Sequence, residues 1–228
     1  MSAPTGPLSS LYYHELLWLI TGICTNCEAV FRETDPPTDG HFIKVDPEIH
    51  ARIATILTNA ANVKKLLTAP PEKPKSQSVE LYEARKRRAG ALQAALKGID
   101  LTEMFNVKVR NSIEHFDEYL DEANLDLNAA ATPPAPLAAY NLTFSSWDLM
   151  TPRPYPVRLY VADEKKFHNL KYSVDLAKLY DEASAVRSRL LVTPAIAGLQ
   201  PGGLMVTLGP RPADPDAEEP IALRRKRR

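Results

Sequence analysis

Three residues of one short stretch, Arg110, Asn111 and His115, have the types and the spacing that suit chemistry on a phosphodiester. On an α-helix Asn111 and His115 stand one above the other, and the long Arg110 side chain can cross the roughly 140° of arc that separates it from His115. Histidine, with an unperturbed pKa of about 6.5, can take a proton from a 2′-hydroxyl or give one to a leaving 5′-oxygen. A preorganised arginine stabilises the charge that grows on the phosphate. The stretch therefore predicts a phosphate-binding site that can move a proton.

The same stretch also permits a purely structural interpretation. Glu114 lies four residues after Arg110, where it can form a surface ion pair that contributes a few tenths of a kcal/mol. His115 would then be a solvated helix histidine. The neighbouring acids Glu114, Asp117 and Glu118 oppose a bare phosphate site, unless they position the arginine or face a basic partner helix. Both interpretations remain open.

The pattern Arg110-Asn111-x-x-x-His115 resembles the signature of the HEPN superfamily, all-helical domains in which an arginine, four to six residues and a histidine occupy one helix. The resemblance covers roughly the first 130 residues. It implies a metal-independent endoribonuclease of a defence or toxin–antitoxin system, in which two protomers join their motifs in one cleft. Arg110 and His115 would be essential and Asn111 supporting, the products would carry 2′,3′-cyclic phosphates, and the partners would be RNA, a second copy of the chain and an antitoxin protein.

Other members of that superfamily keep the helical bundle and only bind or dimerise. The resemblance therefore also implies a second function for this chain, a non-catalytic helical dimerisation module or RNA-binding module. Such a protein would use the motif around Arg110 for contacts alone.

Periodic apolar residues predict the helices that must hold the motif. The motif helix carries its apolar stripe at spacings of four, three and four residues, on Val109, Ile113, Phe116 and Leu120. Caps such as Asp46-Pro47-Glu48 and Gly98 mark helix ends. We expect helices over about 9–33, 46–68, 78–97 and 101–130. Four helices of similar length with short links predict a mainly α fold, an up-down HEPN-like helical bundle over residues 9–136.

The composition changes after the prolines near residue 136. Residues 140–144, 157–161 and 166–172 are rich in β-branched and aromatic side chains, and the last two segments flank the turn at 163–165. A final helix is expected over residues 174–191. We predict a small β-hairpin plus helix over residues 137–191 that packs on the bundle, followed by a disordered, basic-ended tail over residues 192–228.

The net charge of the chain does not attract nucleic acid, because 28 Lys and Arg residues balance 28 Asp and Glu residues. Any such binding must come from a local patch. We name the candidate the basic block: Arg85, Lys86, Arg87 and Arg88. It is predicted to contact RNA phosphates, although a run of this kind is more often a solvated face. The terminal cluster at residues 224–228 is interpreted as a solubilising tail, with non-specific binding to nucleic acid or a membrane surface as the alternative.

Other classes of protein lack support in the sequence. Two cysteines make no disulfide framework, and Cys24 and Cys27 are expected to be buried small hydrophobes rather than zinc ligands. Phosphate-binding glycine loops, Gly-x-Ser-x-Gly and His-Glu-x-x-His are missing. We therefore expect no metal and no cofactor. The apolar run at residues 16–24 is too short for a bilayer, so we expect a cytoplasmic protein without membrane association.

Overall fold

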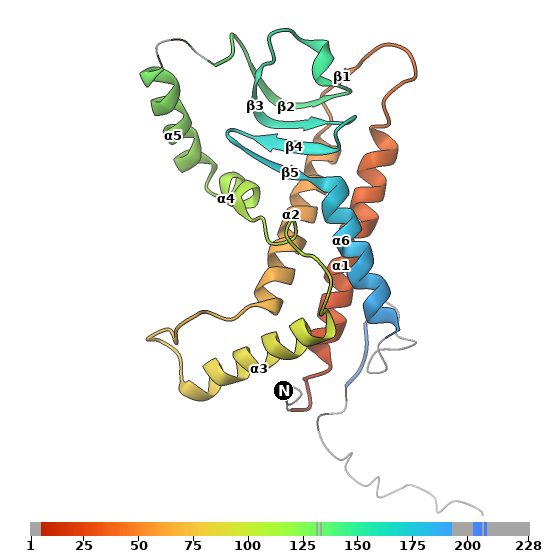
Figure 1. The fold of residues 1–228 in the computed structure, drawn as a ribbon, viewed down its shortest axis with the longest axis vertical. Helices are drawn as coiled ribbons and strands as arrows, with labels where there is room; N and C mark the ends of the chain where they lie inside the picture. The colour runs from red at the N-terminus through yellow and green to blue at the C-terminus, as the bar shows by residue number, and fades with distance from the viewer. Residues whose placement is uncertain (1–5, 131, 133, 193–202, 207, 209–228) are drawn as a thin grey trace, which may run out of the picture.

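The computed structural model describes residues 6–130, 132, 134–192, 203–206 and 208. Within these residues the chain forms six α-helices and one five-stranded sheet, and the sheet lies at one end of the molecule (Figure 1). In chain order the elements are α1 (Leu11–Glu33), β1 (Ile43–Lys44), α2 (Pro47–Leu67), α3 (Val79–Ala95), α4 (Lys108–Glu114), α5 (Phe116–Ala129), β2 (Ala138–Phe144), the 3-10 turn η1 (Trp147–Leu149), β3 (Tyr155–Val161), β4 (Lys166–Asn169), β5 (Tyr172–Asp175) and α6 (Leu176–Leu191).

Local capping explains where the first helices begin and end. The Asp46 carboxylate accepts hydrogen bonds from the backbone N–H groups of Glu48 and Ile49, so α2 starts at the predicted cap. The Ser78 hydroxyl accepts from the N–H of Leu81 and starts α3 in the same way. Gly98 follows α3 with φ +87°, a left-handed conformation that glycine adopts without strain. These predicted boundaries are confirmed.

The main hydrophobic core lies between α1, α2 and α6, which run alongside one another (Figure 1). α1 supplies a broad apolar surface, and Cys24 and Cys27 are buried within it, as predicted. Burial raises the pKa of both thiols. Tyr160, Phe167 and Val174 extend this core from the strands. Residues from both ends of the chain therefore share one core.

The sheet has the order β1-β2-β3-β4-β5 and covers the upper end of the three core helices (Figure 1). β2 and β3 are parallel, and every other pair is antiparallel. The predicted hairpin forms between β3 and β4, with Leu159 opposite His168 and Val161 opposite Lys166.

The predicted fold class, a mainly α up-down helical bundle with a small hairpin and helix appendage, is wrong. The chain forms a five-stranded mixed sheet, and α6 packs against α1 within the main core. The two-residue strand β1 carries no periodicity, and it pairs with β2 across about 100 residues of chain. The local sequence pattern also does not predict that β2 and β3 pair in parallel, because the alternation of side chains along a strand does not identify its partner strand.

The single motif helix expected over residues 101–130 is also wrong. Residues 101–107 form turns, α4 covers seven residues, and the chain leaves helical geometry at His115, with φ −109° and ψ 46°, before α5 begins. α4 is held under the sheet by Ser112, which hydrogen-bonds Asn169 of β4. Arg110 and His115 therefore belong to an interrupted helix rather than to one rod.

The predicted tail, residues 192–228, lies largely outside the described residues, and the terminal basic cluster at 224–228 lies wholly outside them. Within the described part of the chain, no helix combines the length and the apolarity that crossing a membrane requires.

Candidate functional site

Arg110 lies on α4 with its guanidinium turned toward its own helix. It forms an ion pair with Glu114, and its Nη1 donates to the Asn111 side-chain oxygen at 3.4 Å. Its side chain is 22% exposed. Two members of the predicted catalytic trio are thus in contact, and the positive charge of the arginine is shared with a carboxylate.

His115 occupies the break between α4 and α5. Its side chain is 57% exposed, and its Nδ1 lies 3.9 Å from a carboxylate oxygen of Glu118. Each ionisable group of the motif therefore faces an acid, Arg110 through Glu114 and His115 through Glu118. This is the pairing that the structural interpretation expects for Arg110. The catalytic role of the trio remains a prediction.

Arg88, the last residue of the basic block, closes the C-terminal end of α2. Its Nε donates to the Leu66 carbonyl at 3.2 Å, and its Nη2 donates to the carbonyls of Lys65 and Thr68 at 3.0 and 3.2 Å. These are the carbonyls that a helix end leaves without partners, and a cation also complements the negative end of the helix dipole. Burial lowers the pKa of Arg88, and nearby Arg85 lowers it further. Arg88 therefore has a structural role whatever it binds.

Lys65, Arg85 and Arg88 line a cavity of about 500 Å³ between the end of α2 and the start of α3, together with Thr68, Ala69 and Pro70. We call this cavity the basic cleft. Among the residues that the structure describes, its lining contains three cations and no acid. The basic block thus divides: Arg85 and Arg88 face the basic cleft, and Arg87 is exposed beside them. Lys86 instead pairs with Glu83 at 3.4 Å.

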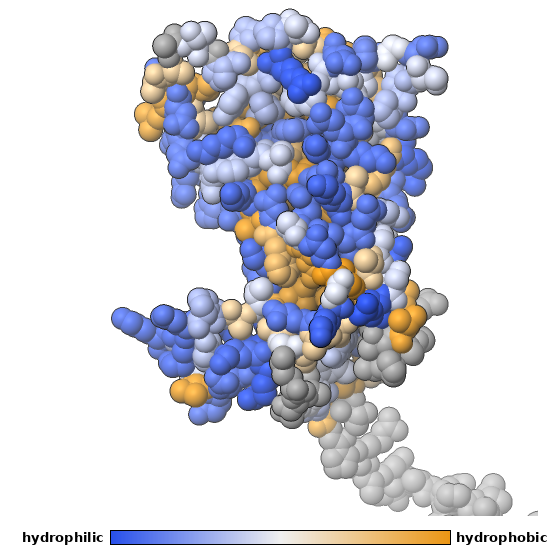
Figure 2. All heavy atoms as spheres, in the orientation of Figure 1, coloured by the Kyte–Doolittle hydropathy of each residue, from blue (hydrophilic) through white to orange (hydrophobic). Residues whose placement is uncertain are grey.

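The segment that builds the basic cleft is strongly positive in a chain that is neutral overall. Residues 64–88 contain eight Lys or Arg against three Glu, a net charge of +5. The N-terminal half of α3 projects from the body, and most of its surface in the space-filling view is hydrophilic, beside a small apolar patch (Figures 1 and 2). Sequence reasoning missed Lys65, whose only signal was the pair Lys64-Lys65 just before the Pro/Lys-rich link.

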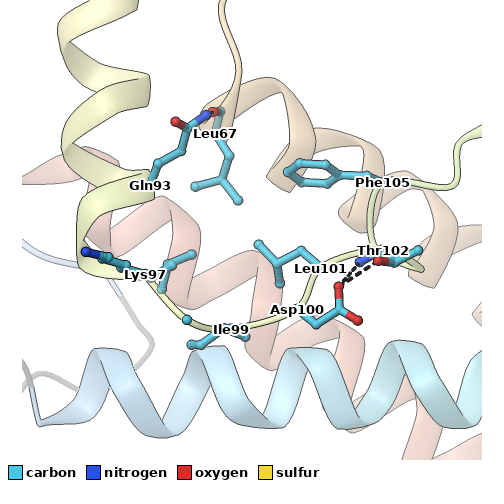
Figure 3. Close-up of a pocket in the computed structure, with 10 residues that line it drawn as sticks. Leu67, Gln93, Lys97, Ile99, Asp100, Leu101, Thr102 and Phe105 are labelled. Atoms are coloured by element: carbon cyan, nitrogen blue, oxygen red, sulfur yellow. Dashed lines mark hydrogen bonds between the residues drawn. The ribbon is translucent and has the colours of Figure 1, made fainter.

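A second cavity, of about 380 Å³, lies where the ends of α2 and α3 meet the loop after α3 (Figure 3). Leu67, Leu101 and Phe105 face its interior. The Asp100 carboxylate at this cavity already accepts hydrogen bonds from the backbone N–H and the hydroxyl of Thr102. This cavity offers an apolar surface and no convergent set of free polar groups.

Two histidines make the folded state sensitive to acid. Burial lowers the pKa of both His50 and His168; Asp46 opposes the shift for the first and Glu164 for the second. A histidine whose folded pKa lies below its unfolded value of about 6.5 stabilises the fold above that pH. This stability is lost as the pH falls from about 7 through the folded pKa, because the unfolded chain takes up protons that the folded chain resists.

We expect the free energy of unfolding, measured by urea titration, to decrease between pH 7.5 and 5.5. The variant His50→Gln with His168→Gln should show a smaller decrease over this interval. Comparison with that variant separates the histidines from Glu182, whose pKa is raised by burial and which acts in the opposite direction. Equal slopes in the two proteins would contradict the assignment.

Among the described residues, no three His, Cys, Asp or Glu side chains gather as metal ligands would. Comparison of the chain with protein-family models, with curated proteins and with solved structures gave no match.

Proposed function

We propose that this protein binds RNA through the basic cleft between α2 and α3. The observation that carries the proposal is the cleft lining, in which Lys65, Arg85 and Arg88 converge and no described residue contributes a carboxylate. An RNA backbone presents one negative charge per nucleotide, and neutralising those charges releases counterions. A net charge of +5 over residues 64–88 supplies the attraction that the neutral chain as a whole does not.

The two arginines of the cleft have different tasks in this proposal. Arg88 is fixed by three carbonyls and therefore presents its remaining N–H groups and its charge in a set position. Arg85 is not held in that way, and its planar guanidinium can bind a phosphate through two parallel hydrogen bonds. Arg87 on the exposed face of α3 extends the track toward a neighbouring phosphate.

Fluorescence anisotropy with a labelled single-stranded 12-nucleotide RNA tests the proposal. Three or four phosphate contacts predict that affinity falls about twenty- to fiftyfold between roughly 50 and 200 mM salt, since each contact contributes about 0.7 to the logarithmic slope. Affinity that does not change with salt, or no binding at 50 mM, would remove the proposal.

A second candidate function is the HEPN-type endoribonuclease, formed by two protomers. The observation in its favour is His115, whose imidazole is exposed while the Glu118 carboxylate lies 3.9 Å from its Nδ1, which leaves Nε2 available for proton transfer. Arg110 and Asn111 would have to meet the phosphate from the other protomer or after Glu114 moves away. An antitoxin protein would then cover this surface.

The variant His115→Ala separates the two functions. If the nuclease proposal holds, wild-type protein cleaves RNA in the presence of EDTA to products with 2′,3′-cyclic phosphates, and the variant is slower by about 10²- to 10⁴-fold. The matched control is His41→Ala, an exposed histidine in the loop between α1 and β1, which should cleave normally. If wild-type protein binds RNA but does not cleave it, the nuclease proposal is excluded and only the binding function is kept.

A further inference from the structure

We propose that a cavity between α2, α4 and the sheet binds a small organic anion, a carboxylate or phosphate carried on a flat apolar ring. The cavity has a volume of about 330 Å³, at the lower end of the range for small-ligand sites. His50, Asn141 and Arg158 supply its polar groups, and Ala54, Ile113 and Phe167 supply apolar walls. We call it the Arg158 cavity. His50 lies about 22 Å along α2 from Lys65, so this site is separate from the basic cleft.

Two strained residues face each other at the cavity. Asn141 on β2 has φ 52° and Arg158 on β3 has φ 53°. They lie opposite one another in the parallel pair, between Tyr140–Val157 and Leu142–Leu159. A left-handed backbone is uncommon for arginine, and such strain persists only where the surroundings enforce it, most often at ligand sites. Here it brings both side chains to one cavity.

Buried hydrogen bonds hold Arg158 in this conformation. Its backbone N–H donates to the Asn169 side-chain oxygen at 3.1 Å. The Asn169 amide nitrogen in turn donates to the hydroxyl and the carbonyl oxygen of Ser112 at 2.9 and 3.2 Å. Asn169 and Ser112 are both fully buried. The backbone of Arg158 is therefore tied to α4 through Asn169.

The charge of Arg158 has no counterion within the described residues. Its guanidinium lies over the ring of Phe116 at 4.2 Å, and its Nε is shielded from water without a hydrogen-bond partner. Arg110, by contrast, pairs with Glu114, and Arg52 pairs with Glu33 and Glu48. A partly buried cation that lacks a carboxylate favours an anionic ligand, and its planar fork fits a carboxylate or a phosphate.

His50 completes the recognition of such a ligand. Both of its ring nitrogens are shielded from water, the backbone of Leu142 lies within reach of the ring, and the ring lies edge-on to Phe167 at 6.0 Å. Burial lowers the pKa of His50, and Arg158 is close enough to lower it further. With His50 neutral, the guanidinium of Arg158 is the charged partner of the anion. The His50 imidazole can form one hydrogen bond with the ligand.

Calorimetric titration of the full chain with benzoate, phenyl phosphate and neutral benzamide tests this site. We expect one of the two anions to bind at least about tenfold more tightly than benzamide, because a charged hydrogen-bond pair is lost with the amide. The compound that binds more tightly, benzoate or phenyl phosphate, shows whether the site prefers a carboxylate or a phosphate. Equal affinity for all three compounds, or no binding of any, overturns the proposal.

Two variants and a matched control locate the binding. Arg158→Gly removes the cation at a backbone angle that glycine prefers, so the protein should keep its melting temperature and lose the anion preference. Lys165→Gly is the control, because Lys165 also has a positive φ of 51° and lies over a ring, that of Phe31, but lines no part of this cavity. Ala54→Leu keeps every charge and fills the space.

The expected pattern is loss of anion binding in Arg158→Gly and Ala54→Leu and unchanged binding in Lys165→Gly. If Lys165→Gly loses anion binding as Arg158→Gly does, anion binding depends on surface charge in general, and the assignment to the Arg158 cavity is wrong. If Ala54→Leu binds as the wild type does, the anion is not in the cavity.

Discussion

Replacing Arg85 and Arg87 together by glutamate is expected to weaken RNA binding on the order of a hundredfold in ~50 mM salt. Each substitution removes a phosphate contact and adds a repulsive charge to a segment whose net charge of +5 would fall to +1. Neither side chain is among those that cap α2, so the helical circular dichroism and the melting temperature should stay close to wild type. Fluorescence anisotropy against the same 12-nucleotide RNA measures the effect.

The design omits Arg88 because its three hydrogen bonds close α2, and its loss would mix instability with weak binding. The matched control is Arg32→Glu with Arg153→Glu, two exposed arginines, one in the last turn of α1 and one in the loop before β3, with the same change in net charge. The control should lose only a few fold in affinity. Equal losses in the two double variants would mean that RNA responds to total charge, and the basic cleft would then have no special part.

Asn169→Ala is expected to lower the free energy of unfolding by about 3–4 kcal/mol. The side chain is 0% exposed and joins three elements, accepting from the N–H of Arg158 on β3 and donating to Ser112 on α4. Its removal leaves buried polar groups unsatisfied, each costing about 1–3 kcal/mol, and opens a small cavity. For a chain of this size the melting temperature should fall by roughly 6–16 °C.

Asn106→Ala is the matched control. Its amide also makes two hydrogen bonds, to the Glu103 side chain and the Ser173 carbonyl, but in a partly exposed position. We expect a loss of about 1 kcal/mol or less there, because water replaces the lost partners. Differential scanning calorimetry compares the two. A melting temperature of Asn169→Ala within about 2 °C of wild type would show that the buried amide does not hold α4 to the sheet.

Most helices were predictable because their signals are local. Asp46, Ser78 and Gly98 mark boundaries through their own side chains or backbone angles, and the apolar period shows which side of α1 and α2 is buried. The hairpin of β3 and β4 was predictable for the same reason, since a short turn joins two alternating segments. In each of these elements the interacting residues are near neighbours in the chain.

The break at His115 and the place of α6 were not predictable in this way. The apolar stripe runs through residue 115 without interruption, yet Ser112 is tied to Asn169, 57 residues later, and α5 leaves in another direction (Figure 1). α6 looked like an appendage because its amphipathic pattern does not say which surface it covers. Long-range contacts decided both features.

The basic cleft and the Arg158 cavity show the same difference between local and long-range signals. The sequence by itself determined the basic block, because consecutive cations cannot avoid forming a local positive field, and it determined that Glu114 could neutralise Arg110. Only the tertiary structure decided that Lys65 joins Arg85, and that His50, Asn141 and Arg158 share a cavity. Residues so far apart have no spacing that a pattern can detect. The packing of α2 against α3 brings the first pair together, and the meeting of α2 with the strands brings His50, Asn141 and Arg158 together.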